Sequence, residues 1–129
     1  MNDIKLMNKA ADNIRILAAS MVEKAKSGHP GGAMGGADFV NVLFSEFLVY
    51  DPKNPAWEGR DRYFQDPGHM SPMLYSVLAL AGKFTIDELK EFRQWGSVTP
   101  GHPEVNVMRG IENTSGPLGQ GHTLSLIHI

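Results

Sequence analysis

Ser115-Gly116-Pro117-Leu118-Gly119-Gln120-Gly121-His122 is the stretch on which the fold of this chain depends, with three glycines and one proline in eight residues. Glycine allows positive φ and a close approach to backbone N–H groups, and proline suits the first turn of a helix. The stretch therefore predicts a tight turn that leads into a helix N-terminus. Free backbone donors and partial positive charge at such a terminus favour an anionic or polar ligand. A glycine-rich turn that binds nothing is the alternative.

The composition is that of an ordinary globular domain. Hydrophobic residues make up 42% and charged residues 20% of the 129 residues, enough for one modest domain with a core. The net charge of -2, with no basic face, argues against a nucleic-acid partner. The chain has no cysteine, which excludes disulfides and thiolate metal sites and fits a reducing compartment. It shows no signal peptide and no membrane-spanning run, so a cytoplasmic location is expected.

Apolar residues at helical spacing occupy much of the chain. The predicted helices cover residues 3–26, 33–48, 72–82 and 85–94. Asn2 or Asp3 is expected to cap the first helix, and Ser71 the third. The pattern from Thr85 to Glu88 is a capping box that opens the fourth helix.

Residues 61–66 are a candidate strand, with two aromatic residues between charged ones. A long loop is expected from Gly96 to Ser115, and ordered loops of that length usually serve function. With so little sheet, the apolar faces of residues 33–48 and 73–80 are expected to stay partly uncovered, which favours aggregation.

Four of the five histidines directly follow a glycine, namely His29, His69, His102 and His122. Imidazole titrates near neutrality and both donates and accepts hydrogen bonds. His29, His69 and His102 are expected in glycine- and proline-containing loops. Histidines in loops of this kind indicate a site that binds hydroxyls, carbonyls or phosphates and that also transfers protons. Gly-His-Pro could instead be a plain turn.

No metal ligands are predicted, because no histidine pair has the spacing of zinc ligands. A serine hydrolase lacks its Gly-x-Ser-x-Gly elbow.

Four motifs together resemble the N-terminal domain of transketolase. They are Ser27-Gly28-His29-Pro30-Gly31, Gly68-His69, Gly101-His102-Pro103-Glu104 and Gly116-Pro117-Leu118-Gly119-Gln120-Gly121, in the family's order and near its spacing. The resemblance covers residues 1 to about 122. It implies an α/β fold, here an N-terminal fragment of the thiamine diphosphate-binding fold, mostly helical with one or two short parallel-sheet strands.

The resemblance also implies an activity. Transketolases are transferases that move a two-carbon ketol unit from a ketose phosphate to an aldose phosphate, using thiamine diphosphate in the pentose phosphate pathway of carbohydrate metabolism. They are homodimers with the active site between subunits. The implied partners here are sugar phosphates and, in the full-length protein, a second copy of the chain, with no nucleic acid and no membrane.

The resemblance implies roles for particular residues. His29 and His102 would be catalytic, contacting sugar hydroxyls and the oxyanion near the reacting carbon, and His29 would also transfer a proton. His69 would lie against the cofactor diphosphate. The residues that would line the aminopyrimidine and thiazolium rings are Gly116, Pro117 and Leu118.

The chain departs from the family after residue 122. Residues 123–129 form a tail that does not match the family, and the Gly-Asp-Gly segment that would bind Mg²⁺ (or Ca²⁺) is absent from residues 1–122, the partial N-terminal domain. A fragment of this kind is expected to be inactive alone.

Two alternatives stay open. One is a related enzyme, such as dihydroxyacetone synthase or 1-deoxyxylulose-5-phosphate synthase, although Gly101-His102-Pro103-Glu104 favours transketolase over the latter. The other is a non-catalytic piece or subunit that binds a chain carrying the remaining domains.

Overall fold

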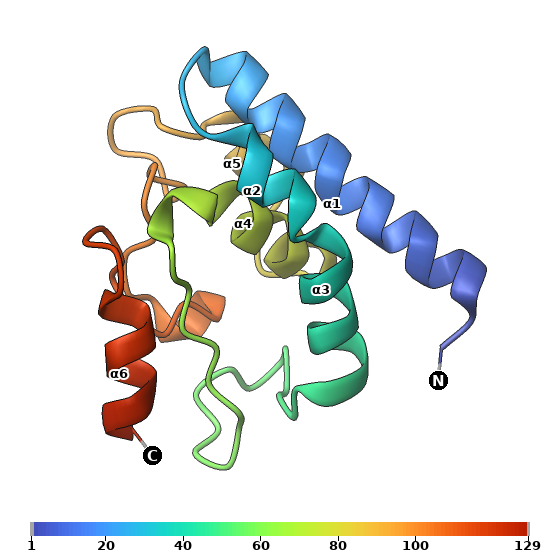
Figure 1. Ribbon diagram of the computed structural model, residues 1–129, viewed down its shortest axis with the longest axis vertical. Coiled ribbons are helices and arrows are strands. Elements are labelled where there is room, and N and C mark those ends of the chain that lie inside the picture. Colours follow the sequence, from blue (N-terminus) through green and yellow to red (C-terminus); the bar gives the residue numbers. More distant parts are fainter. Residues whose placement is uncertain (1, 129) are drawn as a thin grey trace.

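A computed structural model describes residues 2–128 of the chain, and the fold is mostly helical (Figure 1). The α-helices are α1 (Ile4–Ala25), α2 (Pro30–Gly35), α3 (Ala37–Val42), α4 (Ser71–Leu80), α5 (Ile86–Lys90) and α6 (Gln120–His128). A π-helical turn, η1 (Leu43–Phe47), extends α3, and short 3-10 turns are η2 (Gly68–Met70) and η3 (Val107–Arg109). The helical part of the predicted fold is confirmed.

No strand occurs among residues 2–128, where the β-pairing is a single isolated bridge between Asn106 and Ile111. The strand expected at residues 61–66 is therefore not found. The segment is extended, but its backbone at Gln65 is hydrogen-bonded by the side chain of Asn113 and not by a neighbouring strand. The Asn113 carboxamide accepts the Gln65 N–H at 3.1 Å and donates to the Gln65 carbonyl at 3.4 Å.

Helix α1 follows its sequence signals closely. The Asp3 carboxylate accepts the Leu6 N–H at 2.9 Å and so caps the helix, and Lys26 ends it in the left-handed conformation. The buried residues Ala11, Ile14, Ala18 and Met21 recur at helical spacing along one face. This face packs against α2, α3 and α4.

The second predicted helix is divided into three pieces. It begins earlier than expected, because Pro30 occupies a first-turn position where it costs no hydrogen bond. It breaks at Gly36, where the Gly35-Gly36 pair gives little helical preference. A Cβ on Gly36 would lie 2.6 Å from the Met73 sulfur, so the glycine lets this turn pack tightly against α4.

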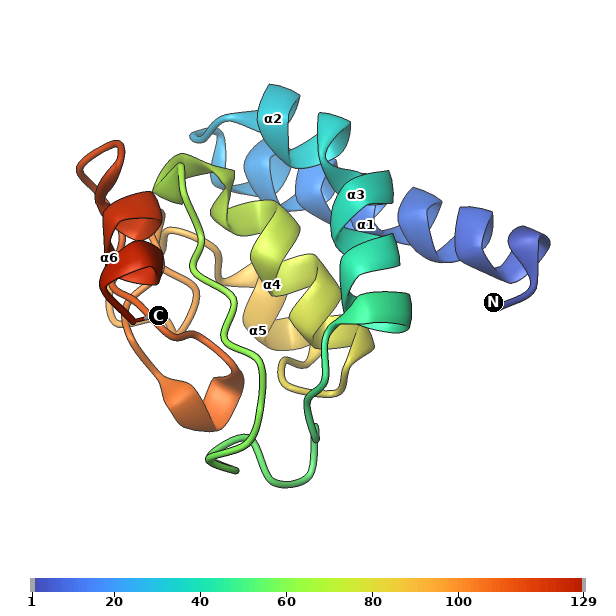
Figure 2. The ribbon, with the colours of Figure 1, turned by 60° about the horizontal axis from the view of Figure 1, so that its bottom comes forward.

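Helix α4 lies in the middle of the molecule, with α1, α2 and α3 along one side (Figures 1 and 2). Every residue from Ser71 to Leu78 is buried. The expectation that residues 73–80 stay partly uncovered is therefore wrong for 73–78. Helix α1, the α5 region and the segment around Ile111 cover them, so no sheet is needed to bury this helix. Ser71 is the first residue of the helix rather than its cap, which is Met70.

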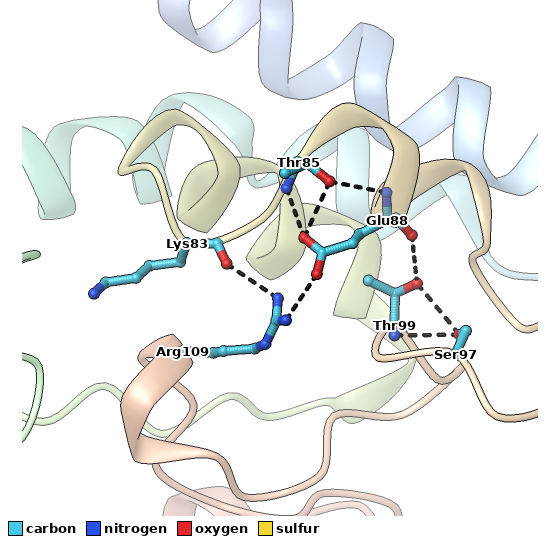
Figure 3. Close-up of polar contacts among 6 residues, drawn as sticks. All are labelled: Lys83, Thr85, Glu88, Ser97, Thr99 and Arg109. Atoms are coloured by element: carbon cyan, nitrogen blue, oxygen red, sulfur yellow. Dashed lines mark hydrogen bonds and ion pairs between the residues drawn. The ribbon is translucent and has the colours of Figure 1, made fainter.

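Helix α5 begins with the predicted capping box. The Thr85 hydroxyl accepts the Glu88 N–H at 3.2 Å, and the Glu88 carboxylate accepts the Thr85 N–H at 2.8 Å (Figure 3). Glu88 also accepts Arg109 Nη2 at 2.7 Å, and its carbonyl accepts the Thr99 hydroxyl at 3.0 Å. These bonds attach the predicted long loop to α5. The helix ends at Lys90, four residues before its predicted end near Gln94.

Candidate functional site

His29 and His69 lie side by side at one end of the helical core. His29 is the residue before α2, and His69 is in the η2 turn that leads into α4. Their ring centroids are 4.8 Å apart with the planes inclined at 52°. The two rings meet because α2 and α4 pack closely, and a Cβ on Gly32 would lie only 2.9 Å from the Met70 side chain. Two histidines separated by forty positions of sequence thus share one location.

His102 belongs to the same end of the molecule, because its loop is attached to α4. The Ser71 hydroxyl donates to the Gly101 carbonyl at 2.7 Å, and the Tyr75 hydroxyl donates to the Pro100 carbonyl at 2.8 Å. Burial raises the pKa of Tyr75, which keeps this phenol protonated and able to donate.

The ionisation of His102 differs from that of an isolated imidazole. Partial burial, followed by the positive charges of Arg93, His69 and His29, lowers the pKa of the His102 ring. This shift favours the neutral ring, which can both donate and accept a hydrogen bond.

An open cavity of about 720 Å³ lies beside His102. Its lining includes Ser27, Arg93, Trp95, His102 and Glu104. The volume is within the usual range for small-molecule sites. The mixture of hydroxyl, guanidinium, imidazole and carboxylate groups suits a polar ligand with several hydrogen-bonding groups.

The glycine-rich stretch of residues 115–122 does turn into a helix, as predicted, with Gly119 at φ 89° and α6 beginning at Gln120. The free helix N-terminus predicted there is wrong, however. The Asp66 carboxylate accepts the Gly119 N–H at 3.2 Å and the His122 N–H at 3.4 Å. A carboxylate of the chain itself therefore binds the first amide groups of α6. Gly121 permits this contact, because a Cβ there would lie 2.6 Å from the Gln65 carbonyl.

Gly116, Pro117 and Leu118 are exposed, and 72% of Leu118 is accessible. Beneath them, Ser115 is buried, and its hydroxyl has no hydrogen-bond partner among the described residues. A Cβ on Gly68 would lie 2.4 Å from that hydroxyl, so the turn rests directly on the segment that carries His69. The Ser115 N–H also donates to the Pro103 carbonyl at 2.9 Å, next to His102.

The structure thus brings together the turns that carry His29, His69, His102 and the glycine-rich stretch. His122 is exposed on α6, and its backbone N–H donates to the Asp66 carboxylate. Sequence reasoning missed Asp66, Arg93 and the unpartnered hydroxyl of Ser115. Charged residues such as Asp66 and Arg93 are common near turns, and the local sequence does not show which distant groups they will contact. The positive φ of Arg93 likewise has no sequence signature.

Within residues 2–128, no group of three or more histidine, aspartate or glutamate side chains is placed to hold a metal ion. No helix in this part of the chain has both the length and the hydrophobicity to cross a bilayer.

Comparison with known proteins agrees with this arrangement. The family model for the transketolase, thiamine diphosphate binding domain, matches residues 6–127. Transketolase of Buchnera aphidicola is 54% identical over 117 residues, which is 90% of this chain and 18% of that protein. Transketolase 1 of Escherichia coli K12 is 53% identical over 112 residues, covering 86% of this chain and 17% of that protein.

Solved structures give the same result. The chain matches transketolase from Campylobacter jejuni with a TM-score of 0.87 and 48% identity, over 93% of this chain and 19% of that one. It matches transketolase from Leishmania mexicana with a TM-score of 0.85 and 49% identity, over 89% and 17%. The fold and the grouped turns thus define the class of thiamine diphosphate-binding domains. More particularly, the chain belongs to the transketolase family, and it spans less than a fifth of the length of these relatives.

Proposed function

We propose that this chain is the N-terminal part of a transketolase and forms one wall of its active site. The reaction is transfer of a two-carbon ketol unit from a ketose phosphate to an aldose phosphate. The observation that carries the proposal is the convergence of the four glycine-rich motifs, with the His29 and His69 rings 4.8 Å apart. Structures of Pichia stipitis transketolase in complex with sedoheptulose-7-phosphate and with xylulose-5-phosphate support sugar phosphates as the substrate class.

The residues present fit thiamine diphosphate. The turn formed by Gly116, Pro117 and Leu118 is exposed, and a Cβ on Gly116 would meet no atom within 4 Å, so a flat ring has room to approach. The buried Ser115 hydroxyl beside Gly68 still lacks a partner among the described residues. We assign His69 to the diphosphate and residues 116–118 to the two rings. When bound, the cofactor supplies the carbanion chemistry.

His29 and His102 are assigned to the sugar. A neutral His102 accepts a hydrogen bond from one sugar hydroxyl and donates to another oxygen, which orients the substrate. His29 holds or transfers a proton at the sugar oxygen next to the reacting carbon. We assign the ligands of Mg²⁺ (or Ca²⁺) to residues outside this chain.

The remaining parts of the proposal concern organisation. Residues 1–122 are assigned to the partial diphosphate-binding domain and residues 123–129 to a tail without functional residues, although the match to the family model runs on to residue 127. The complete protein is proposed to be a cytoplasmic homodimer of the pentose phosphate pathway. The lack of cysteine supports a reducing compartment.

The proposal is tested with a chimeric enzyme. Residues 6–122 of this chain replace the matching segment of E. coli transketolase 1, and ketol transfer is measured with thiamine diphosphate and Mg²⁺. Activity within about tenfold of the parent is expected, because half of the matched residues are already identical. A folded chimera that neither turns over nor binds thiamine diphosphate would refute the proposal. The 129-residue chain alone is expected to show no turnover.

Substitution of the assigned residues separates their roles in that chimera. His69→Ala is expected to weaken thiamine diphosphate binding by about tenfold or more, because a charge-assisted hydrogen bond is lost. His102→Asn is expected to reduce kcat/KM for the sugar while leaving cofactor affinity unchanged. Titration of cofactor and steady-state kinetics measure the two effects, and the same change in both variants would contradict the assignment.

A second candidate function is supported by exposed apolar side chains. Phe39 on α3 and Phe47 in η1 are 66% and 70% exposed. Such a surface suits a non-catalytic N-terminal subunit that binds a separate chain carrying the remaining domains. Mixing the two chains and following complex formation by gel filtration tests this. Absence of both a complex and recovered activity would exclude it.

A further inference from the structure

Arg93 lies between the turn that carries His29 and the loop that carries His102. Its Nη1 donates to the Ser27 hydroxyl at 2.9 Å, and Ser27 is two residues before His29. Its backbone N–H donates to the Thr99 carbonyl at 3.0 Å, three residues before His102. One residue therefore connects two segments that are far apart in the sequence and that both line the 720 Å³ cavity.

The side chain of Arg93 is also held by packing. A Cβ on Gly101 would lie 2.8 Å from Arg93 Nε, so the guanidinium occupies the space left by the missing side chain. The Nε atom is buried without a hydrogen-bond partner among the described residues. The residue has φ 61°, a left-handed conformation that arginine rarely adopts. A strained backbone conformation of this kind persists only where the surrounding structure imposes it.

We propose that Arg93 is a positioning residue, which fixes the His29 turn and the His102 loop relative to each other across the cavity. The inference rests on the proposed function, since it assumes that His29 and His102 act on one substrate. Arg93 itself need not contact that substrate. A small change in the separation of two groups that orient a substrate costs a large factor in rate.

The charge of Arg93 provides a second measurable effect, a shift in the pKa of His102. The groups that face His102 are the cationic Arg93, the rings of His69 and His29, and the carboxylate of Glu104 in the same cavity. Partial burial and then Arg93 contribute most to lowering the pKa of His102. Removal of the guanidinium therefore raises that pKa, and the acid limb of the pH–rate profile moves to higher pH.

The test uses the chimeric transketolase described above, with Arg93→Asn as the main variant. Asparagine tolerates the left-handed conformation, so the change removes the guanidinium without adding backbone strain. We expect kcat/KM for the sugar to fall by about tenfold to a hundredfold, with thiamine diphosphate affinity unchanged. The matched control is Arg15→Asn, which removes an arginine of the exposed Asp12 and Asp38 ion pairs and leaves both parameters unchanged.

Two further variants change the same contact without removing a charge. Ser27→Ala deletes the acceptor of Arg93 Nη1, and Gly101→Ala places a methyl group against Nε. Both are expected to lower kcat/KM in the direction of Arg93→Asn, by a smaller factor for Ser27→Ala. Circular dichroism of each variant shows whether it folds. If Arg93→Asn does not fold, Ser27→Ala and Gly101→Ala test the proposal in its place.

The modification of His102 by diethyl pyrocarbonate, followed by peptide mass spectrometry across pH, reports the pKa of His102 without requiring turnover. Arg93→Asn is expected to raise that pKa. An unsubstituted chimera that lacks ketol transfer overturns the proposed function, whereas the modification profile still tests Arg93. Parental kcat/KM in the folded variants, together with an unshifted His102 profile, would overturn the inference.

Discussion

At the scale of single residues, Gly68 shows how the site depends on missing side chains. The residue is buried immediately before His69, against the hydroxyl and carbonyl carbon of Ser115. Its conformation is open to any residue, since its φ is not in the left-handed region. The requirement for glycine is therefore one of space, because this contact holds the segment that carries His69 against Ser115, where the turn of residues 116–118 begins.

Gly68→Ala is expected to destabilise the fold by about 1–3 kcal/mol, because the new methyl group overpacks the contact with Ser115. It should also weaken thiamine diphosphate binding to the chimera, since the turn must move. Gly35→Ala is the matched control, because a Cβ there meets no atom within 4 Å. Urea unfolding and cofactor titration measure the two effects. Equal behaviour of the two alanine variants would contradict the explanation.

The buried pair of Arg60 and Glu112 leads to a second expectation. The guanidinium donates from Nε at 2.7 Å and from Nη2 at 2.9 Å, and both side chains are 8% exposed. Arg60→Met leaves an unpaired buried carboxylate and is expected to cost about 3 kcal/mol. Combining it with Glu112→Leu should restore most of that loss. Urea midpoints of the single and double variants decide this, and an equally unstable double variant would show that charge pairing is not the cause.

The site residues differ in how far they could be predicted. Glycine-histidine pairs are visible in the sequence because their local chemistry is unusual, and the structure does group His29, His69 and His102 at one end of the core. Asp66 and Arg93 could not be predicted in the same way. Their partners at residues 119, 122 and 27 are more than fifty positions away, and short-range patterns carry no information on such contacts.

At the scale of elements, the start of α5 is the clearest electrostatic feature. Hydrogen bonding to Arg109, followed by the Thr85 N–H, lowers the pKa of Glu88 to about 2. The folded-state pKa is thus below the unfolded value, so the stabilisation is complete above about pH 4.3 and is lost as the pH falls toward 2. This network also attaches the loop of residues 97–109 to the helix (Figure 3).

Glu88→Gln is therefore expected to flatten the dependence of stability on pH between about 4.3 and 2, by about 1 kcal/mol for this partly exposed group. Asp87→Asn is the control, since its partner Lys90 and its own carboxylate are exposed and its effect should be smaller. Urea midpoints measured at several pH values test the difference. Parallel curves for parent and Glu88→Gln would refute it.

Elements were predictable where their signals are local. The cap of α1, the proline start of α4 and the capping box of α5 all lie within four residues of the turns they begin. The division of the second helix at Gly36 was not predictable, nor was the absence of a paired strand at residues 61–66. Both depend on what packs alongside, namely Met73 and the side chain of Asn113.

At the scale of the whole molecule, the chain leaves apolar surface open on α3 and η1. Phe39 and Phe47 are exposed, together with Val42 at 40% and Val49 at 56%. The isolated chain is expected to self-associate as its concentration rises. Phe39→Ser with Phe47→Ser should reduce light scattering. Ile16→Ser on α1, which replaces one residue that is 62% exposed, should change it less. Equal scattering from all three proteins would place the association elsewhere.

The enclosed position of α4 has a consequence for dynamics. Ser71 and Tyr75 anchor the His102 loop, and η2, which carries His69, leads directly into the same helix. The backbone amide hydrogens of a helix in which residues 71–78 are all buried should exchange with solvent most slowly, since their exposure requires global unfolding. We therefore expect the residues that join the His69 and His102 turns to α4 to become exposed only when the whole fold opens.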